Sequence, residues 1–314
     1  MPNRMHRDEI DIDEVLVRRL LTVQMPHMAD LALTLVEPWG TDNAIWRLGD
    51  DYVIRLPRIP RAAQQVEFEA RWLPVLAPAL SVPVPVPVAI GQPGNGYPCP
   101  WAIHRWIPGD GAAFERIDDP TRFALDLALF VRLLQAVPPD GAPSATNRAR
   151  PLADYDASTR HAIHSARHLI DAKAATAVWE ESLAAKPHAG RPVWVHADLE
   201  GNCLVRAGRL GGVVDWGSAC VGDPAVDIQV VWSPLFTTQS RRSFLAALDV
   251  DDATLARSRG AAVNQACSAL PYYLDTYPLI VERSWRKLAA LGVSPRRSRA
   301  APAGRTDPND VGSG

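Results

Sequence analysis

The sequence predicts a mixed α+β protein of two lobes, the first small and mainly β, the second larger and mainly helical. Three observations support this class. Short apolar runs rich in β-branched and aromatic residues dominate residues 43–106. Apolar residues at helical spacing dominate from residue 121 onward. A group of short strand-like runs interrupts that helical part near residues 193–216, so the strands fall into two separate groups.

The N-terminal elements begin with residues 12–23 and 28–36, whose apolar spacing predicts two short helices. Residues 43–48 and 52–56 are apolar runs separated by a Gly-Asp-Asp turn signature. They predict a β-hairpin, with the sequence GTDN forming a turn before it.

Residues 62–76 predict one helix, with a proline, Pro74, near its end. The VPVPVPV run at 82–88 is expected to be an extended connector or a sheet edge, because each proline lacks a backbone donor. The glycine-rich residues 91–96 predict a plain turn, since prolines follow and no helix opens as a dinucleotide loop requires. Residues 101–106 then predict a strand.

The second half contains a long amphipathic segment at 121–137, one or two alanine-rich helices within 155–185, and further helices from Asp227 onward. The change from strands to helices places the lobe boundary near residues 107–111. We therefore expect an N-terminal lobe at 1–106, a helical lobe at 107–294, and a disordered tail at 295–314, where almost nothing can be buried.

The charge pattern excludes several classes of protein. With 33 basic and 35 acidic residues, the chain has no broad cationic surface of the kind that nucleic-acid binding needs. Only three of the basic residues are lysines, namely Lys173, Lys186 and Lys287. A phosphate loop of the GxxxxGK[ST] type is excluded in the first half, because no lysine precedes residue 173.

The four cysteines, at positions 99, 203, 220 and 267, form neither a CxxC pair nor a zinc spacing. The N-terminus carries acidic residues where a signal peptide has an apolar core, and no apolar run reaches eighteen residues. We therefore expect a cytoplasmic protein that does not associate with membranes. Its oligomeric state is left open.

The stretch 193–232 carries the chemistry. His196, Asp198 and Asn202 follow one apolar run, and Asp215 ends another. The hairpin CLVRAGRLGGVVDW brings Asn202 and Asp215 together, and amide and carboxylate oxygens are ligands that Mg²⁺ prefers, with phosphates completing its shell. Asp198 is placed to orient an attacking hydroxyl.

These residues resemble the aminoglycoside phosphotransferase family, a branch of the protein-kinase-like fold. The matching motifs are HADLEGNCLV, VVDW and GDPAVD, with GTDNAIWRL, YVIRLPR and the Glu69 helix earlier, over roughly residues 36–290. The resemblance implies that Asp198 is the catalytic aspartate and that Asn202 and Asp215 bind magnesium. His196 would brace the catalytic loop, with Asp223 and Asp227 as structural supports.

Three positions depart from the family pattern. Ala197 stands where glycine is usual, which asks for slightly more room beside the backbone. Asp198 and Asn202 are four residues apart where five steps are usual, a difference that Glu200 and the permissive Gly201 are expected to absorb. Arg55 occupies the place of the phosphate-binding strand lysine.

The resemblance also predicts the nucleotide site. An arginine can bind phosphate and pair with a helix carboxylate, for which Glu69 is the first candidate and Glu67 the second. Further nucleotide contacts are expected from the turn at Gly40, Thr41 and Asn43, and from hinge amides on the strand that ends near His104 and Trp106.

The implied reaction transfers the γ-phosphoryl group of ATP or GTP, with Mg²⁺, to a hydroxyl of a small molecule, with an aminoglycoside-like antibiotic as the natural acceptor. Acidic residues in the helical half are candidates to meet a cationic acceptor: Glu200, Asp154, Asp275 and Glu282, with Asp156, Glu180 and Glu181. A nucleoside, peptide or macrolide antibiotic, or a metabolite alcohol, stays open as the acceptor. The alternative is a catalytically silent nucleotide-binding module; a protein kinase is disfavoured because no APE-type activation loop is present.

Overall fold

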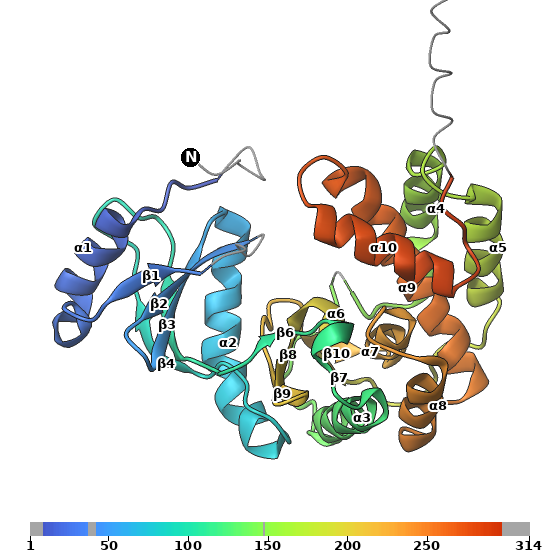
Figure 1. Cartoon of the computed structure of the whole chain (residues 1–314), viewed down its shortest axis with the longest axis horizontal. Helices are drawn as coiled ribbons and strands as arrows, with labels where there is room; N and C mark the ends of the chain where they lie inside the picture. The colour runs from blue at the N-terminus through green and yellow to red at the C-terminus, as the bar shows by residue number, and fades with distance from the viewer. Residues whose placement is uncertain (1–8, 37–41, 147, 297–314) are drawn as a thin grey trace, which may run out of the picture.

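The computed structural model describes residues 9–36, 42–146 and 148–296. It has two parts (Figure 1): an N-terminal part with a sheet and two helices, and a C-terminal part made mostly of helices. The predicted mixed α+β class is therefore confirmed.

The N-terminal sheet is antiparallel and has the strand order β1-β2-β3-β5-β4. Its strands are β1 (Leu33–Leu35), β2 (Asn43–Leu48), β3 (Tyr52–Pro57), β4 (Pro87–Gly91) and β5 (Trp101–Arg105). The predicted hairpin is confirmed as β2 and β3, which pair with Ile45 opposite Arg55. The proline run leads into β4 at a sheet edge, as a strand with missing donors requires.

Two helices accompany this sheet, α1 (Glu14–Gln24) and α2 (Ala63–Leu76). Asp13 caps α1 by accepting a 2.7 Å hydrogen bond from the Leu16 amide. The second helix predicted nearby, at 28–36, is wrong: a 3-10 turn, η1 (Pro26–Met28), leads into strand β1. Pairing with β2 overrides the local spacing, because it satisfies the backbone of this segment and half-buries its leucines.

The C-terminal part is built on seven helices of the described chain. Their bounds are α3 (Pro120–Ala136), α4 (Asp156–Ser165), α5 (Ala172–Leu183), α7 (Ala225–Ile228), α8 (Thr238–Ala247), α9 (Asp252–Tyr273) and α10 (Pro278–Ala290). The remaining short helix, α6 (Leu199–Asn202), carries the candidate catalytic loop. Single 3-10 turns connect the elements: η2 (Pro60–Ala62), η3 (Ala77–Ala79), η4 (Phe114–Arg116), η5 (Leu152–Tyr155) and η6 (Gln229–Trp232).

Two small antiparallel sheets lie among these helices. One contains β6 (Asp110–Gly111), β8 (Cys203–Arg206) and β9 (Arg209–Val213), and the other pairs β7 (Val193–Val195) with β10 (Cys220–Gly222). The sequence predicted β7, β8 and β9, whereas the two short strands β6 and β10 were missed. The pairing of Cys203 with Val213 sets the ends of β8 and β9 side by side, which positions the site described below.

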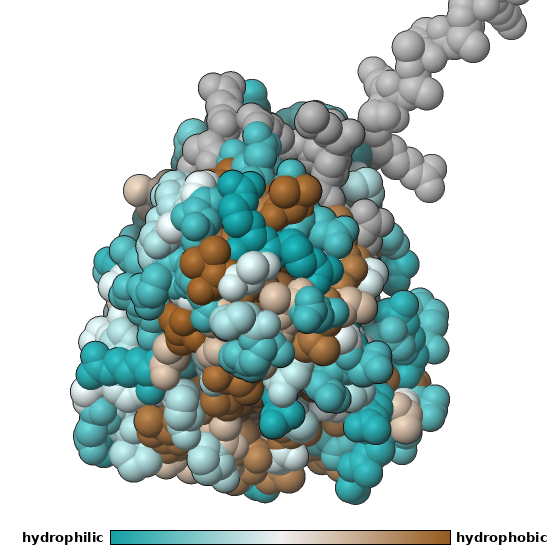
Figure 2. Space-filling view, turned by 90° about the vertical axis from the view of Figure 1, so that its left-hand side faces the viewer, coloured by the Kyte–Doolittle hydropathy of each residue, from teal (hydrophilic) through white to brown (hydrophobic). Residues whose placement is uncertain are grey.

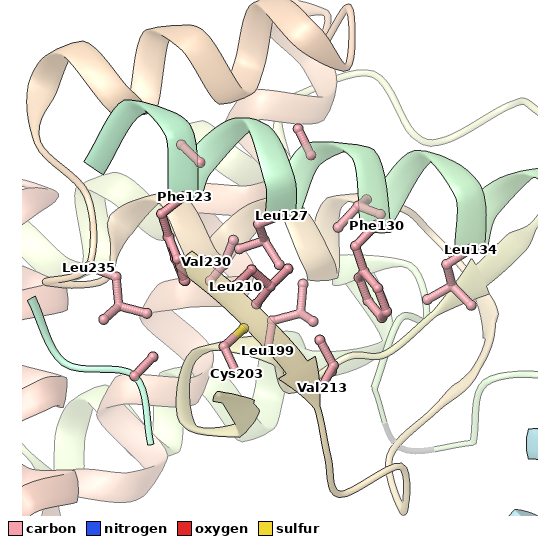
Figure 3. Packing of buried hydrophobic residues seen from close by; sticks show 14 of the residues in the cluster. Phe123, Leu127, Phe130, Leu134, Leu199, Cys203, Leu210, Val213, Val230 and Leu235 are labelled. Atoms are coloured by element: carbon pink, nitrogen blue, oxygen red, sulfur yellow. The ribbon is translucent and has the colours of Figure 1, made fainter. Parts of the chain in front are cut away.

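A buried apolar layer supports these strands (Figure 3). Helix α3 directs Phe123, Leu127, Phe130 and Leu134, all with no exposed surface, toward the β8–β9 hairpin and its neighbours. Burying a large apolar side chain contributes roughly 1.5–3 kcal/mol, so this layer fixes the hairpin firmly beneath the helix.

The chain leaves the first sheet after Arg105, and its next strand, β6, pairs with β8 in the C-terminal part. We therefore place the boundary of the lobes between these strands. Pro295 and Arg296, at the start of the predicted disordered tail, pair with Ile170 and Leu169, and the rest of that tail lies outside the described residues.

The outer face of the N-terminal lobe (Figure 2) shows apolar residues interspersed with polar ones. The exposed large apolar side chains of the N-terminal lobe as a whole include Val15, Val23, Leu31, Val88 and Ile90. Among the described helices, none combines the length and the apolar character that crossing a membrane requires.

Candidate active site

The loop after β7 carries His196, Ala197 and Asp198, and a buried carboxylate holds its backbone. Asp227 accepts hydrogen bonds from the His196 amide (2.9 Å) and the Ala197 amide (2.7 Å). Burial raises the pKa of Asp227 to about 7, although these two hydrogen bonds oppose the shift. Ala197 has φ +65°. The alanine at the usual glycine position must therefore adopt a left-handed backbone, which is unfavourable for a residue with a Cβ, and does not merely need more room.

His196 has no exposed surface and links this loop to the neighbouring strand. Its Nδ1 accepts from the Asp198 amide (3.3 Å), so Nε2 carries the hydrogen and donates to the Val214 carbonyl (3.0 Å). Burial lowers the pKa of His196, which keeps this neutral tautomer in place. The ring also packs edge-on against Trp216, with centroids 4.9 Å apart.

Within residues 9–36, 42–146 and 148–296, the side-chain contacts of Asp198 are made through one of its two carboxylate oxygens. Its Oδ1 accepts a hydrogen bond from Gln265 Nε2 (3.0 Å) and forms an ion pair with Arg148 Nη1 (2.8 Å). Burial by itself raises the pKa of Asp198, but the Arg148 guanidinium outweighs it, so the pKa lies below its ordinary value. The side chain is 31% exposed, so a base ionised at neutral pH remains within reach of a ligand.

The shortened loop still brings Asn202 to Asp198. Residues 199–202 form the single helical turn α6, and Asn202 Nδ2 donates to the Asp198 carbonyl at 2.8 Å. Gly201 is not left-handed, so the helical turn, and not a special glycine conformation, accommodates the missing residue. The Asn202 side-chain oxygen is thereby left as the ligand atom of this amide.

Asp215 lies beside Asn202 because β8 and β9 pair. The Val214 amide donates to the Asn202 carbonyl at 2.9 Å, and Asp215 follows with φ +58° and a side chain that is 47% exposed. One amide oxygen and one accessible carboxylate are hard donors that fit Mg²⁺, which usually takes few protein ligands plus phosphates and water. The described residues contain no group of three His, Cys, Asp or Glu side chains able to hold a metal by themselves.

Arg55 connects the two lobes. Its Nη1 donates to Glu69 Oε1, and its Nη2 meets Asp215 Oδ1 at 2.6 Å and Gln65 Oε1 at 3.3 Å. Glu69, not Glu67, is therefore the helix partner. Although burial works the other way, these carboxylates raise the pKa of Arg55 above its ordinary value. Glu69 also accepts a 3.3 Å hydrogen bond from the Trp216 amide, so α2 is tied to the segment after β9.

Of the other residues predicted to contact the nucleotide, some lie near Arg55, some lie outside the described residues, and one has its amide already bonded. Asn43 is buried and its Nδ2 donates to Gln65 Oε1 (3.0 Å), one contact away from Arg55, whereas Gly40 and Thr41 lie outside the described residues. The expectation of a hinge donor at Trp106 needs correction, because its amide already donates to the Asp51 carbonyl at 2.7 Å.

His104 lies inside β5, and its imidazole points into the interior. Nδ1 contacts the Pro85 carbonyl at 2.7 Å, and Nε2 lies 3.9 Å from Glu69 Oε2. Burial, helped by the Arg55 charge, lowers the pKa of His104 to about 4. A neutral imidazole at this position packs against the Arg55–Glu69 pair, a role that the sequence did not suggest.

The acidic acceptor candidates are mostly paired within the chain. Asp154 pairs with Arg150 (2.9 Å), Glu282 with Arg286 (2.6 Å), and Glu200 with the buried Lys287 (2.5 Å). Asp156 and Glu180 both meet Arg160, and Glu181 meets Arg259. Asp275 is exposed in the turn that follows α9. The negative charge predicted for a cationic acceptor is therefore largely neutralised.

Asp223, the predicted support, forms a buried ion pair with Arg257, with its Oδ2 2.7 Å from Nε, and accepts from the Ala225 amide at 2.9 Å. It thus fastens the start of α7 to α9, just ahead of Asp227.

Four side chains of the site escaped the sequence reasoning: Gln65, Arg148, Gln265 and Lys287. Each lies outside the recognisable motifs, and each reaches the site through packing of distant elements. Lys287 alone carried a signal, since it is one of only three lysines.

Comparisons with known proteins agree with this geometry. A sequence model of the phosphotransferase enzyme family matches residues 36–262. The GDP and kanamycin complex of APH(2")-IIia is 20% identical in sequence with a TM-score of 0.70, over 89% of this chain and 99% of that one. The GDP complex of wild-type aminoglycoside 2'-phosphotransferase-IIIa is 20% identical with a TM-score of 0.69, over 90% and 99%.

A macrolide phosphotransferase is also similar. The macrolide 2'-phosphotransferase MphH from Brachybacterium faecium is 26% identical with a TM-score of 0.58, over 87% of this chain and 97% of that one. No curated protein sequence matches the chain significantly. The structural likeness confirms the kinase-like bilobed fold that the motifs implied.

Proposed function

Since the chain belongs to the phosphotransferase enzyme family, we propose that it transfers the γ-phosphoryl group of ATP or GTP to a hydroxyl of an antibiotic. One observation carries this proposal: Asp198 and Asn202 of the catalytic turn, Asp215 after β9 and Arg55 of β3 come from three separate segments and form a connected group. Asn202 bonds to Asp198 at 2.8 Å, and Asp215 to Arg55 at 2.6 Å. A base, two hard oxygen donors and a phosphate-binding cation are what this reaction needs.

The role of each residue in the reaction follows from the atoms that its contacts leave available. Asp198 Oδ2 accepts the proton of the acceptor hydroxyl, because Oδ1 is held by Arg148 and Gln265. The hydroxyl oxygen forms a bond to the γ-phosphorus as the bond to the bridging β–γ oxygen breaks, and the nucleoside diphosphate leaves. Magnesium, when bound by Asn202 and Asp215, neutralises phosphate charge. Arg55 Nη2, which faces Asp215, lies where it can turn to a phosphate oxygen.

The acceptor side favours an antibiotic with few positive charges. Three rings in edge-to-face contact, those of Tyr272, Tyr273 and Tyr277, lie at the C-terminal end of α9 and just beyond it. Burial, together with the neighbouring Tyr272 and the charges of Asp42 and Asp198, raises the pKa of Tyr273. Aromatic rings can pack against the apolar face of a hydroxylated molecule such as a macrolide, and the pairing of Asp154, Glu282 and Glu200 within the chain leaves little negative charge for a polycation.

The proposal is tested by incubating the purified protein with ATP or GTP and Mg²⁺ against a panel of macrolides and aminoglycosides. Mass spectrometry should detect a phosphorylated antibiotic, and Asp198→Asn should reduce kcat by at least about 1,000-fold while nucleotide binding persists. Full turnover by Asp198→Asn would overturn the mechanism. Magnesium-dependent nucleotide binding without product from any acceptor would instead identify a silent nucleotide-binding module.

A further inference from the structure

Lys287, on α10, is the buried lysine of the described chain and has no role in the phosphotransfer scheme above. Its side chain is 4% exposed, whereas Lys173 and Lys186 are exposed on the surface. Placing an ammonium group in the interior is costly unless it is paired and hydrogen-bonded. Its partners therefore indicate what the burial of this charge achieves.

Lys287 Nζ has two partners. It forms an ion pair with Glu200 Oε2 at 2.5 Å, and it donates a hydrogen bond to Gln265 Oε1 at 2.6 Å. Glu200 belongs to the catalytic turn α6, and Gln265 belongs to α9. One buried charge thus ties the last helix both to the catalytic turn and to the long helix behind it.

The contact with Gln265 fixes which way its amide faces. A lysine ammonium only donates, so the oxygen of the amide must point toward Lys287 and its NH₂ group toward Asp198. That NH₂ group donates to Asp198 Oδ1 at 3.0 Å. Lys287 holds the amide at its oxygen and Asp198 holds it at its nitrogen, so the loss of the ammonium leaves the Gln265 side chain held at one end only and able to move away from the carboxylate.

The ion pair at the centre of the network is mostly buried, with Lys287 4% and Glu200 11% exposed, whereas Asp198 is 31% exposed. A cavity of about 10 Å³, lined by Asp198, Glu200, Gln229, Gln265 and Lys287 among others, adjoins it. That volume holds at most about one water molecule. Hydrogen bonds in such a setting hold their geometry more firmly than those in open solvent.

We propose that Lys287 and Gln265 are positioning residues: Lys287 orients the Gln265 amide, and Gln265 holds Oδ1 of Asp198 so that Oδ2 faces the acceptor hydroxyl. Arg148, in the loop between α3 and η5, forms an ion pair with the same Oδ1 atom. The carboxylate is thereby clamped at one oxygen and left open at the other. This inference rests on the proposed function, because it assigns the geometry of that reaction's base.

The test compares Lys287→Met and Gln265→Leu with the wild type, and uses Lys173→Met as the matched control. Both site variants should lower kcat about 10- to 100-fold, as a misplaced catalytic group does, while the KM values for nucleotide and acceptor change less than about twofold. Lys287→Arg, which can still meet Glu200 and donate to Gln265, should retain kcat within about threefold. Lys173→Met should match the wild type.

A structural readout separates this inference from the proposed function. In a crystal structure of Lys287→Met, the Gln265 amide should no longer donate to Asp198 Oδ1. Gln265→Leu serves the same purpose in turnover measurements should Lys287→Met fail to fold, because it leaves the Lys287–Glu200 pair intact. An unchanged Gln265–Asp198 contact in Lys287→Met, or wild-type kcat in Gln265→Leu, overturns the inference. A wild-type protein without turnover overturns only the proposed function.

Discussion

Arg55 makes up, at the scale of one residue, for the absence of any lysine in the first 172 positions. A planar guanidinium can contact Glu69, Asp215 and Gln65 at once, which a point-like ammonium could not do with the same geometry. Arg55 is therefore both the candidate phosphate ligand and the link between the lobes.

Arg55→Ala is expected to lower kcat/KM for the nucleotide by about 100-fold, because it removes a preorganised charge at the phosphates. The measurement is steady-state kinetics with varied nucleotide. Arg61→Ala is the appropriate control, since Arg61 is 68% exposed. Arg58→Ala is a poor control, because Arg58 is buried and bonds to Glu9 at 2.7 Å, so its loss destabilises the fold. If Arg55→Ala and Arg61→Ala changed kcat/KM equally, Arg55 would not replace a phosphate-binding lysine. The shortage of lysines would then be a compositional bias without functional meaning.

At the scale of elements, strand β5 meets helix α2 through a buried histidine. The Nδ1 atom of His104 contacts the Pro85 carbonyl at 2.7 Å, and its Nε2 atom lies 3.9 Å from Oε2 of Glu69 on α2. Its pKa of about 4 means that the folded protein resists protonation of this ring.

This histidine predicts a pH dependence of stability. An unfolded histidine takes up its proton near pH 6.5, but folded His104 does so only near pH 4. The unfolded state thus binds more protons at this ring in this window, so the contribution of His104 to stability is complete above pH 6.5 and falls as the pH drops toward 4, by about 2 kcal/mol at pH 5.

Urea unfolding of the wild type and His104→Gln at pH 7.5 and pH 5 tests this expectation. Glutamine keeps a donor for the Pro85 carbonyl but does not titrate, so the variant should lose less stability on acidification. His168→Gln, at an exposed position, should behave like the wild type. An identical pH dependence in wild type and His104→Gln would contradict the assignment.

At the scale of the whole molecule, the candidate metal and phosphate groups come from both lobes. Arg55 and Glu69 belong to the N-terminal lobe, whereas Asn202 and Asp215 belong to the C-terminal lobe. A nucleotide bound with its metal would therefore join the lobes and stabilise the folded state as a unit.

Nucleotide with Mg²⁺ is expected to stabilise the protein by about 2.7 kcal/mol at 100 times Kd, seen as a rise in Tm. Adding EDTA should remove most of that rise, because the phosphate charges then lack their counter-ion. Asp215→Ala and Asn202→Ala should abolish the magnesium-dependent part, with Asp249→Ala as a control at another left-handed aspartate far along the chain. A rise independent of both metal and these variants would refute the ligand assignment.

Much of the architecture could be read from local pattern, and the exceptions have clear causes. The β2–β3 hairpin follows from alternating apolar residues around a Gly-Asp-Asp turn, and α3 from its helical spacing. Residues 28–36 were mispredicted because a three-residue edge strand depends on a partner strand and not on its own sequence. The two-residue strand β6 carries too few residues for any pattern.

The sequence by itself determined the class of fold, the family, and the candidate residues His196, Asp198, Asn202 and Asp215, because these lie within a few positions of one another or at both ends of one hairpin. Only the tertiary structure decided that Glu69 pairs with Arg55 and that the Trp106 amide donates a hydrogen bond to the Asp51 carbonyl. It also decided that Arg148, Gln265 and Lys287 surround the base. Those contacts depend on how helices far apart in the chain pack against one another. Such packing depends on the shapes of whole surfaces, which the spacing of residues within one segment does not reveal.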